Sequence, residues 1–170
     1  VGRAKEVQKA EAARRAGEDV VAALPELKDI LDVLKRAYDI TAENTGIGST
    51  IFAEKPGDGS AREQAASCQK VLGGWANISR EYATKRYRSN LINWGMLPFL
   101  VDQGDLPFEN GDYIFVPGIA DIIKSGKEEA KAYVVNKEMK EFIVRTAALT
   151  EDERQIILDG CLINYYRNNK

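Results

Sequence analysis

A glycine-rich loop between a short apolar segment and a helical run is the feature that most constrains the fold of this chain. Residues 50–53 (TIFA) have the β-branched and aromatic character of a strand, and residues 62–72 have the composition of a helix. Gly57 and Gly59 lie between them, and we expect both to adopt positive φ and to let the backbone approach a ligand. A strand, a glycine loop and a helix in this order place the N-terminus of the helix at a cleft.

Two interpretations of the residues at the start of this helix remain open. Ser60-Ala61-Arg62-Glu63 fits the S-x-x-E capping box, in which Ser60 and Glu63 satisfy the backbone N–H groups of the first turn. The same residues would also form an anion site that contains a hydroxyl, because the first turn offers unpaired N–H groups and the positive end of the helix dipole. Arg62 adds a planar fork that suits a carboxylate or a phosphate.

The rest of the chain alternates between helical and strand patterns, which predicts an α/β fold. Further helices are predicted over residues 5–15, 27–38, 81–93, 120–124 and 150–158. Further strands are predicted over residues 76–79, 97–101, 113–116, 130–136 and 141–146, the last two as a hairpin. Thr150 and Glu153 form a second capping-box pattern, and that helix is expected to stop at Gly160.

Composition excludes several kinds of site. The chain has no histidine, which removes the Ser–His triads and every His-dependent metal site, so no metal ligand is assigned. Cys68 and Cys161 are expected to be buried, reduced thiols, in keeping with a cytoplasmic protein. No apolar stretch is long enough to cross a membrane, and no signal-peptide pattern opens the chain.

The segment 80–88 is locally basic, with four cationic residues against one acidic residue and two interleaved tyrosines. Such a segment could bind a nucleic-acid backbone, or it could be a helix face that is solvated or docked on an acidic neighbour. The whole chain has 24 basic and 26 acidic residues, and its formal charge of -2 favours the second interpretation over nucleic acid.

Two linked motifs resemble a known family. Residues 59–66 (GSAREQAA) resemble the G-S-S-R-E-H-A-A signature of the aconitase and isopropylmalate isomerase swivel domain. Residues 88–99 (RSNLINWGMLPF) resemble the R-x-N-L-I-N-x-G-x-L-P-L run of the same domains. The resemblance is good over residues 45–99 and looser over the C-terminal third.

The resemblance implies a fold and an organisation. It implies an aconitase-type swivel domain with a short mixed β-sheet flanked by helices, preceded by a helical segment. Residues 1–170 would be one domain, with a helical segment over 1–44 and an α/β core over 45–170, and the chain would be the C-terminal fragment of a longer polypeptide.

The resemblance also implies an activity, which is that of a hydro-lyase of the aconitate hydratase type. This lyase would reversibly dehydrate a hydroxy di- or tricarboxylic acid. Ser60 would be the catalytic base, and Arg62 would bind the substrate carboxylate together with Gly59 and Ala61. A 4Fe-4S cluster would be ligated outside this chain, on cluster-bearing domains or a large subunit, so the isolated domain would be inactive.

The chain departs from the family pattern at three places. Ala61 replaces the second serine of the signature, Gln64 replaces its histidine, and the T-T-D-H-I-like motif that usually opens the domain is not found. These departures leave the substrate open among citrate, homocitrate, isopropylmalate and other acids. The alternative is a non-catalytic anion- or RNA-binding module that uses the Ser60 loop and the basic segment 80–88.

Overall fold

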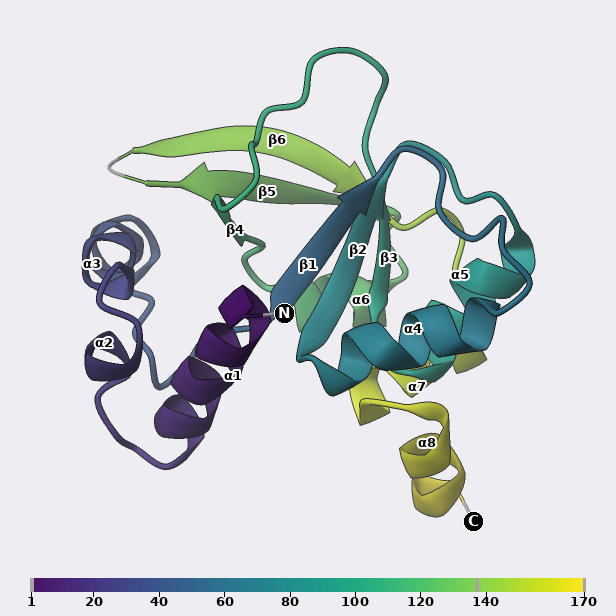
Figure 1. The fold of residues 1–170 in the computed structure, drawn as a ribbon, viewed down its shortest axis with the longest axis horizontal. Coiled ribbons are helices and arrows are strands. Elements are labelled where there is room, and N and C mark those ends of the chain that lie inside the picture. The colour runs from purple at the N-terminus through teal and green to yellow at the C-terminus, as the bar shows by residue number, and fades with distance from the viewer. Residues whose placement is uncertain (1, 137, 170) are drawn as a thin grey trace.

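The structure is a computed structural model that describes residues 2–136 and 138–169, and it has a mixed α/β fold (Figure 1). The helices are α1 Gly2–Arg15, α2 Val20–Ala23, α3 Leu27–Tyr38, α4 Arg62–Val71, α5 Lys85–Asn93, α6 Ile119–Ser125, α7 Glu151–Asp159 and α8 Leu162–Asn168. The strands are β1 Ser49–Ala53, β2 Gly74–Ser79, β3 Leu97–Leu100, β4 Tyr113–Phe115, β5 Glu129–Val135 and β6 Met139–Arg145.

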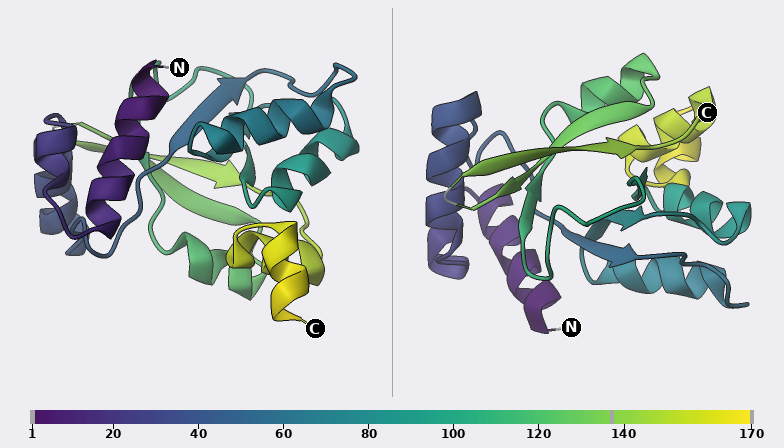
Figure 2. Two further views of the ribbon diagram at one scale, coloured as in Figure 1. Left: turned by 60° about the horizontal axis from the view of Figure 1, so that its bottom comes forward. Right: turned by 90° about the horizontal axis from the view of Figure 1, so that it is seen from above.

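The strands form one sheet in the order β1-β2-β3-β6-β5-β4. Strands β1, β2 and β3 are parallel, whereas β6, β5 and β4 are paired antiparallel. The two halves join at a single register pair, Leu100 opposite Arg145. Because the join is so short, the β5–β6 hairpin turns away from the parallel half and the sheet is curled, as the views of Figure 2 show.

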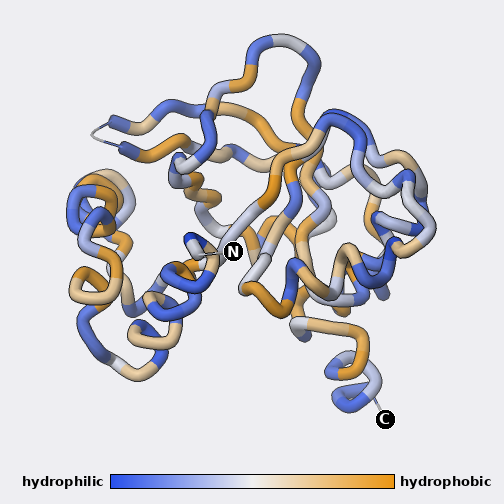
Figure 3. Tube along the Cα trace, in the orientation of Figure 1, coloured by the Kyte–Doolittle hydropathy of each residue, from blue (hydrophilic) through white to orange (hydrophobic). Residues whose placement is uncertain are grey.

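Helices α4 and α5 are the crossovers between the parallel strands, and they pack together beside the sheet (Figure 1). Between them lies a core of Ala66, Tyr87, Leu91 and Met96. A crossover between parallel strands returns the chain to the same edge of the sheet, so β1, β2 and β3 all end at one edge. Figure 3 shows stretches of hydrophobic colour within these strands and mostly hydrophilic colour on the loop after β1.

A second core fills the inside of the curled sheet. It is built around Ile78, Phe99, Ala132 and Val144, with α6 packed against it. Helices α1 and α2 and part of α3 enclose a third cluster, and the rest of α3 packs on the end of β5 around Val135. None of the described helices has the length and apolar character that a membrane span requires.

A buried carboxylate fastens α1 to the segment before β1. Glu11 accepts hydrogen bonds from Arg14 Nε at 2.7 Å, from Arg15 Nε at 3.0 Å and from the backbone N–H of Ile47 at 2.8 Å. Burial alone would raise the pKa of this carboxyl, but the hydrogen bonds from Arg14 and Ile47 and the charge of Arg14 hold its pKa below the ordinary value. The helical N-terminal segment is therefore bonded to the core as well as packed on it.

Most of the predicted elements are confirmed, including the hairpin and the capping box of α7. The helix predicted over residues 81–93 is wrong at its start, because α5 begins only at Lys85. Residues 80–84 instead run along the loop after β1, where the N–H groups of Glu81 and Ala83 donate to the carbonyls of Glu54 and Pro56. Helices α2 and α8 were not predicted.

Candidate functional site

The candidate site lies where the parallel strands end. Residues 54–61 follow β1, residues 80–84 follow β2 and residues 101–112 follow β3. Ligands of open α/β sheets bind outside the carboxyl ends of the strands. The first two of these loops are also bonded to one another along their length through the Glu81 and Ala83 N–H groups.

Gly57 fixes the shape of the loop after β1. Its φ is 98°, and a Cβ at this position would lie 2.4 Å from the Cβ of Tyr87, so only glycine fits. Its carbonyl accepts hydrogen bonds from Arg62 Nε at 3.0 Å and from Thr84 Oγ1 at 3.3 Å. The expectation for Gly59 is wrong, since Gly59 is not among the described residues with positive φ and a Cβ there would meet nothing within 4 Å.

The capping box predicted at Ser60 and Glu63 does not form. The N-cap of α4 is Ala61, and no side chain caps this helix. The helix thus begins one residue later than the S-x-x-E pattern requires, which puts Gln64 rather than Glu63 at the third helical position. The side chain of Ser60 is exposed, and it makes no hydrogen bond to the described residues.

The first turn of α4 therefore keeps its donors. Within residues 2–136 and 138–169, the N–H groups of Arg62, Glu63 and Gln64 have no acceptor, and the first bonded amide is that of Ala65. Helix α7 differs, because Thr150 and Glu153 cap it reciprocally. The uncapped N-terminus of α4 is a set of backbone donors at the positive end of a ten-residue helix.

Arg62 stands beside these donors with part of its guanidinium engaged. Its Nε donates to the Gly57 carbonyl, which holds the half-buried side chain against the loop. In the described chain no carboxylate lies within ion-pair distance of Arg62. The two terminal nitrogens can thus meet an anion as a fork.

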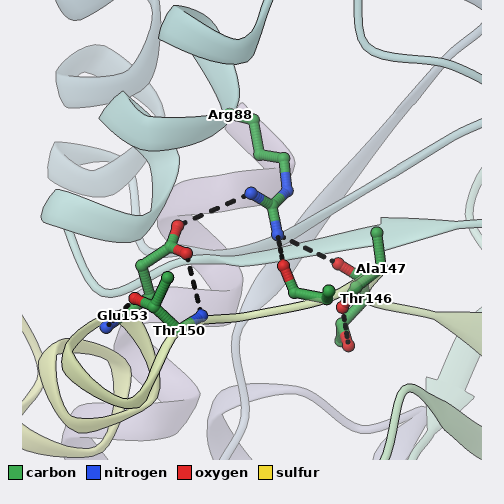
Figure 4. Close-up of polar contacts among 6 residues, drawn as sticks. Arg88, Thr146, Ala147, Thr150 and Glu153 are labelled. Carbon is green, nitrogen blue, oxygen red and sulfur yellow. Dashed lines mark hydrogen bonds and ion pairs between the residues drawn. The ribbon is translucent and has the colours of Figure 1, made fainter.

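Two arginines of the basic segment 80–88 are engaged inside the fold. Arg88 reaches from α5 to the segment between β6 and α7, as Figure 4 shows. Its Nη2 donates to the carbonyls of Thr146 at 3.3 Å and Ala148 at 3.0 Å, and its Nη1 lies 3.5 Å from Glu153 Oε2. Arg80 is almost fully covered and donates to Glu54 and to two carbonyls of the loop after β3. These contacts agree with the interpretation in which the basic segment is docked on other parts of the fold. They leave fewer free cations to bind a nucleic-acid backbone.

The Ser60 loop, residues 54–61, lies on the surface of the molecule. A cavity of about 230 Å³ lies nearby, against the start of α5. Its lining is Arg80, Glu81, Tyr82, Thr84, Lys85, Arg88, Leu100 and Ala147. Neither Ser60 nor Arg62 belongs to this lining, so a ligand at the α4 N-terminus would stay exposed to water unless another domain covered it.

The sequence analysis did not identify the residues that support the loop after β1. Thr84 is the N-cap of α5, where its Oγ1 accepts from the Tyr87 N–H, and it also donates to Gly57. Tyr87 is buried and accepts hydrogen bonds from Gln69 and Asn77, both at 2.9 Å. A threonine directly before a helical run is an N-cap signal, and this signal would have placed the start of α5 correctly.

The prediction that both cysteines are buried is wrong. Cys68 is exposed on α4 and Cys161 is partly exposed at the start of α8, and both are free thiols. Helix α4 is covered only on the side of Ala66, which leaves position 68 facing solvent. Within the described chain, no group of three or more acidic or cysteine side chains could hold a metal ion.

Comparisons with known proteins show the family of this chain. The family model described as the aconitase C-terminal domain matches residues 15–104. The methanogen homoaconitase small subunit of Methanocaldococcus jannaschii is 29% identical over 124 residues, which is 72% of this chain and 64% of that protein. The homoaconitase small subunit of Thermus thermophilus is 33% identical over 78 residues, which is 46% of this chain and 47% of that protein. A putative mitochondrial aconitate hydratase of Emericella nidulans is 30% identical over 118 residues, which is 67% of this chain but only 15% of that protein.

A solved structure has the same fold. The crystal structure of 3-isopropylmalate dehydratase from Methanocaldococcus jannaschii superposes with a TM-score of 0.54 at 22% identity, covering 86% of this chain and 83% of that one. The curled mixed sheet with its flanking helices is therefore the aconitase-type small-subunit fold. Since the family model spans more than half of the sequence, the chain belongs to the aconitase C-terminal domain family.

Proposed function

We propose that this chain is the swivel domain, over residues 1–170, of an aconitase-type hydro-lyase that acts on a hydroxy di- or tricarboxylic acid. Ser60 is the base that removes the carbon-bound proton. Arg62, together with Gly59 and Ala61, binds a substrate carboxylate. The reaction class is supported by the relatives, whose names include aconitate hydratases, homoaconitase small subunits and an isopropylmalate dehydratase.

The observation that carries the proposal is the uncapped start of α4. A formed capping box would have engaged the Ser60 hydroxyl with the Glu63 N–H, and the Glu63 side chain with the N–H of Ser60. Three kinds of donor have no partner among the described residues: the Ser60 hydroxyl, the N–H groups of Arg62, Glu63 and Gln64, and the two terminal nitrogens of Arg62, whose Nε is bonded to Gly57. Such donors suit one carboxylate, and the Ser60 hydroxyl lies two residues before the helix in the sequence.

These residues can do the proton-transfer half of a dehydration. Ser60, as an alkoxide, takes a proton from the carbon next to a substrate carboxylate. The electron pair of the broken C–H bond becomes the C=C bond as hydroxide leaves the neighbouring carbon. The charge that develops on the carboxylate meets Arg62 and the first-turn N–H groups, and the same donors stabilise the alkoxide.

The family implies a 4Fe-4S cluster, which would supply the Lewis acid for the departing hydroxyl. The residues of this chain do not fit such a cluster, because it needs three or four thiolates and the sequence has two cysteines. We propose that the cluster is held by a large subunit or by other domains, outside this chain. Two free thiols also support a reducing compartment such as the cytoplasm.

A cluster-bearing partner would also cover the site. The Ser60 loop is exposed and outside the nearby cavity, yet an alkoxide base needs a site from which water is excluded. The partner would supply that cover and the remaining substrate contacts. The chain spans only 15% of the fungal aconitate hydratase and 47% and 64% of the two homoaconitase small subunits.

The test is Ser60→Ala in the assembled enzyme, measured with citrate, homocitrate and isopropylmalate as substrates. Loss of the base should lower kcat by about 10²-fold or more while KM stays nearly unchanged. Ser67→Ala is the matched control, since Ser67 lies on the helix that follows Ser60 and, among the described residues, its hydroxyl bonds only to the Gln64 carbonyl, at 3.2 Å. A Ser60→Ala enzyme that turns over at the control rate on its best substrate would refute the assignment.

A further inference from the structure

We propose that Arg80 is the positioning residue of this site: it fixes the loop that carries Ser60 against the loop that follows β3. The expected effect of Arg80 on turnover rests on the proposed function, whereas the anchoring of the two loops rests only on the contacts of Arg80. In the sequence Arg80 belongs to a basic segment that suggested a surface patch. In the structure its side chain is only 11% exposed.

The guanidinium of Arg80 binds two loops at once. Its Nε lies 3.0 Å from Glu54 Oε2, in the loop between β1 and α4. Its Nη1 donates to the Asp102 carbonyl at 2.5 Å and its Nη2 donates to the Gly104 carbonyl at 2.5 Å, both in the loop after β3. Arg80 itself follows β2, so one side chain ties together the loops that end all three parallel strands.

The backbone beside Arg80 continues this support toward Ser60. The N–H groups of Glu81 and Ala83 donate to the carbonyls of Glu54 and Pro56, at 3.1 Å and 2.9 Å. The Thr84 hydroxyl then donates to the Gly57 carbonyl. The loop therefore lies on a row of donors from segment 80–84, and Arg80 anchors the end of the row that lies farthest from Ser60.

Lysine could not replace arginine here. The three acceptors lie in different directions around a planar group, and the fork of arginine reaches them with Nε, Nη1 and Nη2. An ammonium group is one point charge, so at least one loop would lose its bond. The Ser60 loop would then move relative to the rest of the edge, and a displacement of about 1 Å can cost about 10²-fold in rate.

The experiment compares Arg80→Lys with Arg145→Lys in the assembled enzyme. Arg145 is a matched control, because it also binds the loop after β3, through the Asp102 carboxylate, but in the described part of the chain no hydrogen bond or ion pair joins it to residues 54–61. Amide hydrogen exchange is measured at Glu81 and at Ala83, whose N–H groups are bonded to the Ser60 loop. Arg80→Lys should speed exchange there about tenfold or more and lower kcat with KM within about threefold, whereas Arg145→Lys should leave both unchanged.

Three results decide the matter. Exchange at Glu81 and Ala83 that stays at the wild-type rate in Arg80→Lys overturns the inference, whatever the activity. Faster exchange with normal kcat, in an enzyme that Ser60→Ala inactivates, overturns the positioning role. If Arg80→Lys speeds exchange but Ser60→Ala leaves turnover intact, Arg80 anchors the loops as inferred, and Ser60 is not the catalytic base.

A second variant covers the case in which Arg80→Lys does not fold. Glu54→Gln keeps Arg80 and its two bonds to carbonyls, and it weakens only the contact between Arg80 and the Ser60 loop. The Glu54 side chain is 68% exposed, so the change should not disturb folding. We expect a smaller increase in exchange at Glu81 and Ala83 and a smaller fall in kcat. Glu54→Gln with wild-type exchange and wild-type kcat would contradict the inference.

Discussion

Thr150 and Ser60 both begin an S/T-x-x-E pattern, but a capping box forms only at Thr150. Replacing each by alanine, one at a time, measures how much a formed capping box adds to the free energy of unfolding. Thr150 Oγ1 accepts from the Glu153 N–H at 3.1 Å, and Glu153 Oε1 accepts from the Thr150 N–H at 3.0 Å. Thr150→Ala removes the first bond and leaves that N–H unpaired, which costs about 1 kcal/mol and at most about 2. Because Glu153 also lies 3.5 Å from Arg88 Nη1, loosening it weakens a second contact, and we expect the upper half of this range.

Ser60→Ala should change the free energy of unfolding by no more than about 0.5 kcal/mol, as for an exposed residue without a special contact. The assay is urea unfolding of the purified chain at pH 7, with m-values compared to confirm that the same surface unfolds. Thr150→Ser keeps the hydroxyl and serves as the control, with a change below about 0.5 kcal/mol. If Ser60→Ala and Thr150→Ala cost the same, Ser60 caps α4 in solution and the uncapped helix N-terminus that supports the site is refuted.

Two further predictions concern charged side chains. Arg62→Lys in the assembled enzyme keeps the charge but loses the planar guanidinium and its Nε bond to the Gly57 carbonyl. The KM for the carboxylic acid should therefore rise about 10- to 100-fold. An unchanged KM would place Arg62 outside the substrate site. Glu11→Gln should destabilise the chain by about 1–3 kcal/mol at pH 7, because a hydrogen-bonded buried carboxylate is lost. Since the pKa of Glu11 is lowered in the folded state, its contribution is complete above the unfolded pKa of about 4.3 and is lost as the pH falls through the folded pKa. Urea titrations at pH 7 and near pH 3 should therefore show a smaller difference between Glu11→Gln and wild type at the lower pH, and an equal difference at both would contradict the pKa direction.

Local patterns were enough to predict many of the elements. The strand, the glycine loop and helix α4 followed from residues adjacent in sequence, and so did the α7 capping box, whose two partners are three residues apart. These features depend on interactions within one turn of chain. The family was also readable at this level, because its two motifs are short contiguous runs.

Contacts between distant segments decided the rest. The Ser60 pattern is the same as the Thr150 pattern, yet α4 begins at Arg62, after a loop held by Gly57 and Thr84. The start of α5 moved for the same reason, since residues 80–84 bond along the loop after β1 and are not free to form a helical turn. In both cases hydrogen bonds from another segment overrode the local preference.

The sequence was enough to predict the α/β class and the order of most elements, and it suggested Ser60 and Arg62 as candidate site residues. It could not determine which of those residues stay available, because a side chain's partners depend on segments many positions away. The Ser60 hydroxyl makes no hydrogen bond to the described residues, whereas Arg80, which belongs to a basic segment in the sequence, is almost fully buried between two loops. A hydrogen bond needs its acceptor within about 3 Å, and only the packing of β1, β2 and β3 side by side brought the acceptors of Arg80 that close.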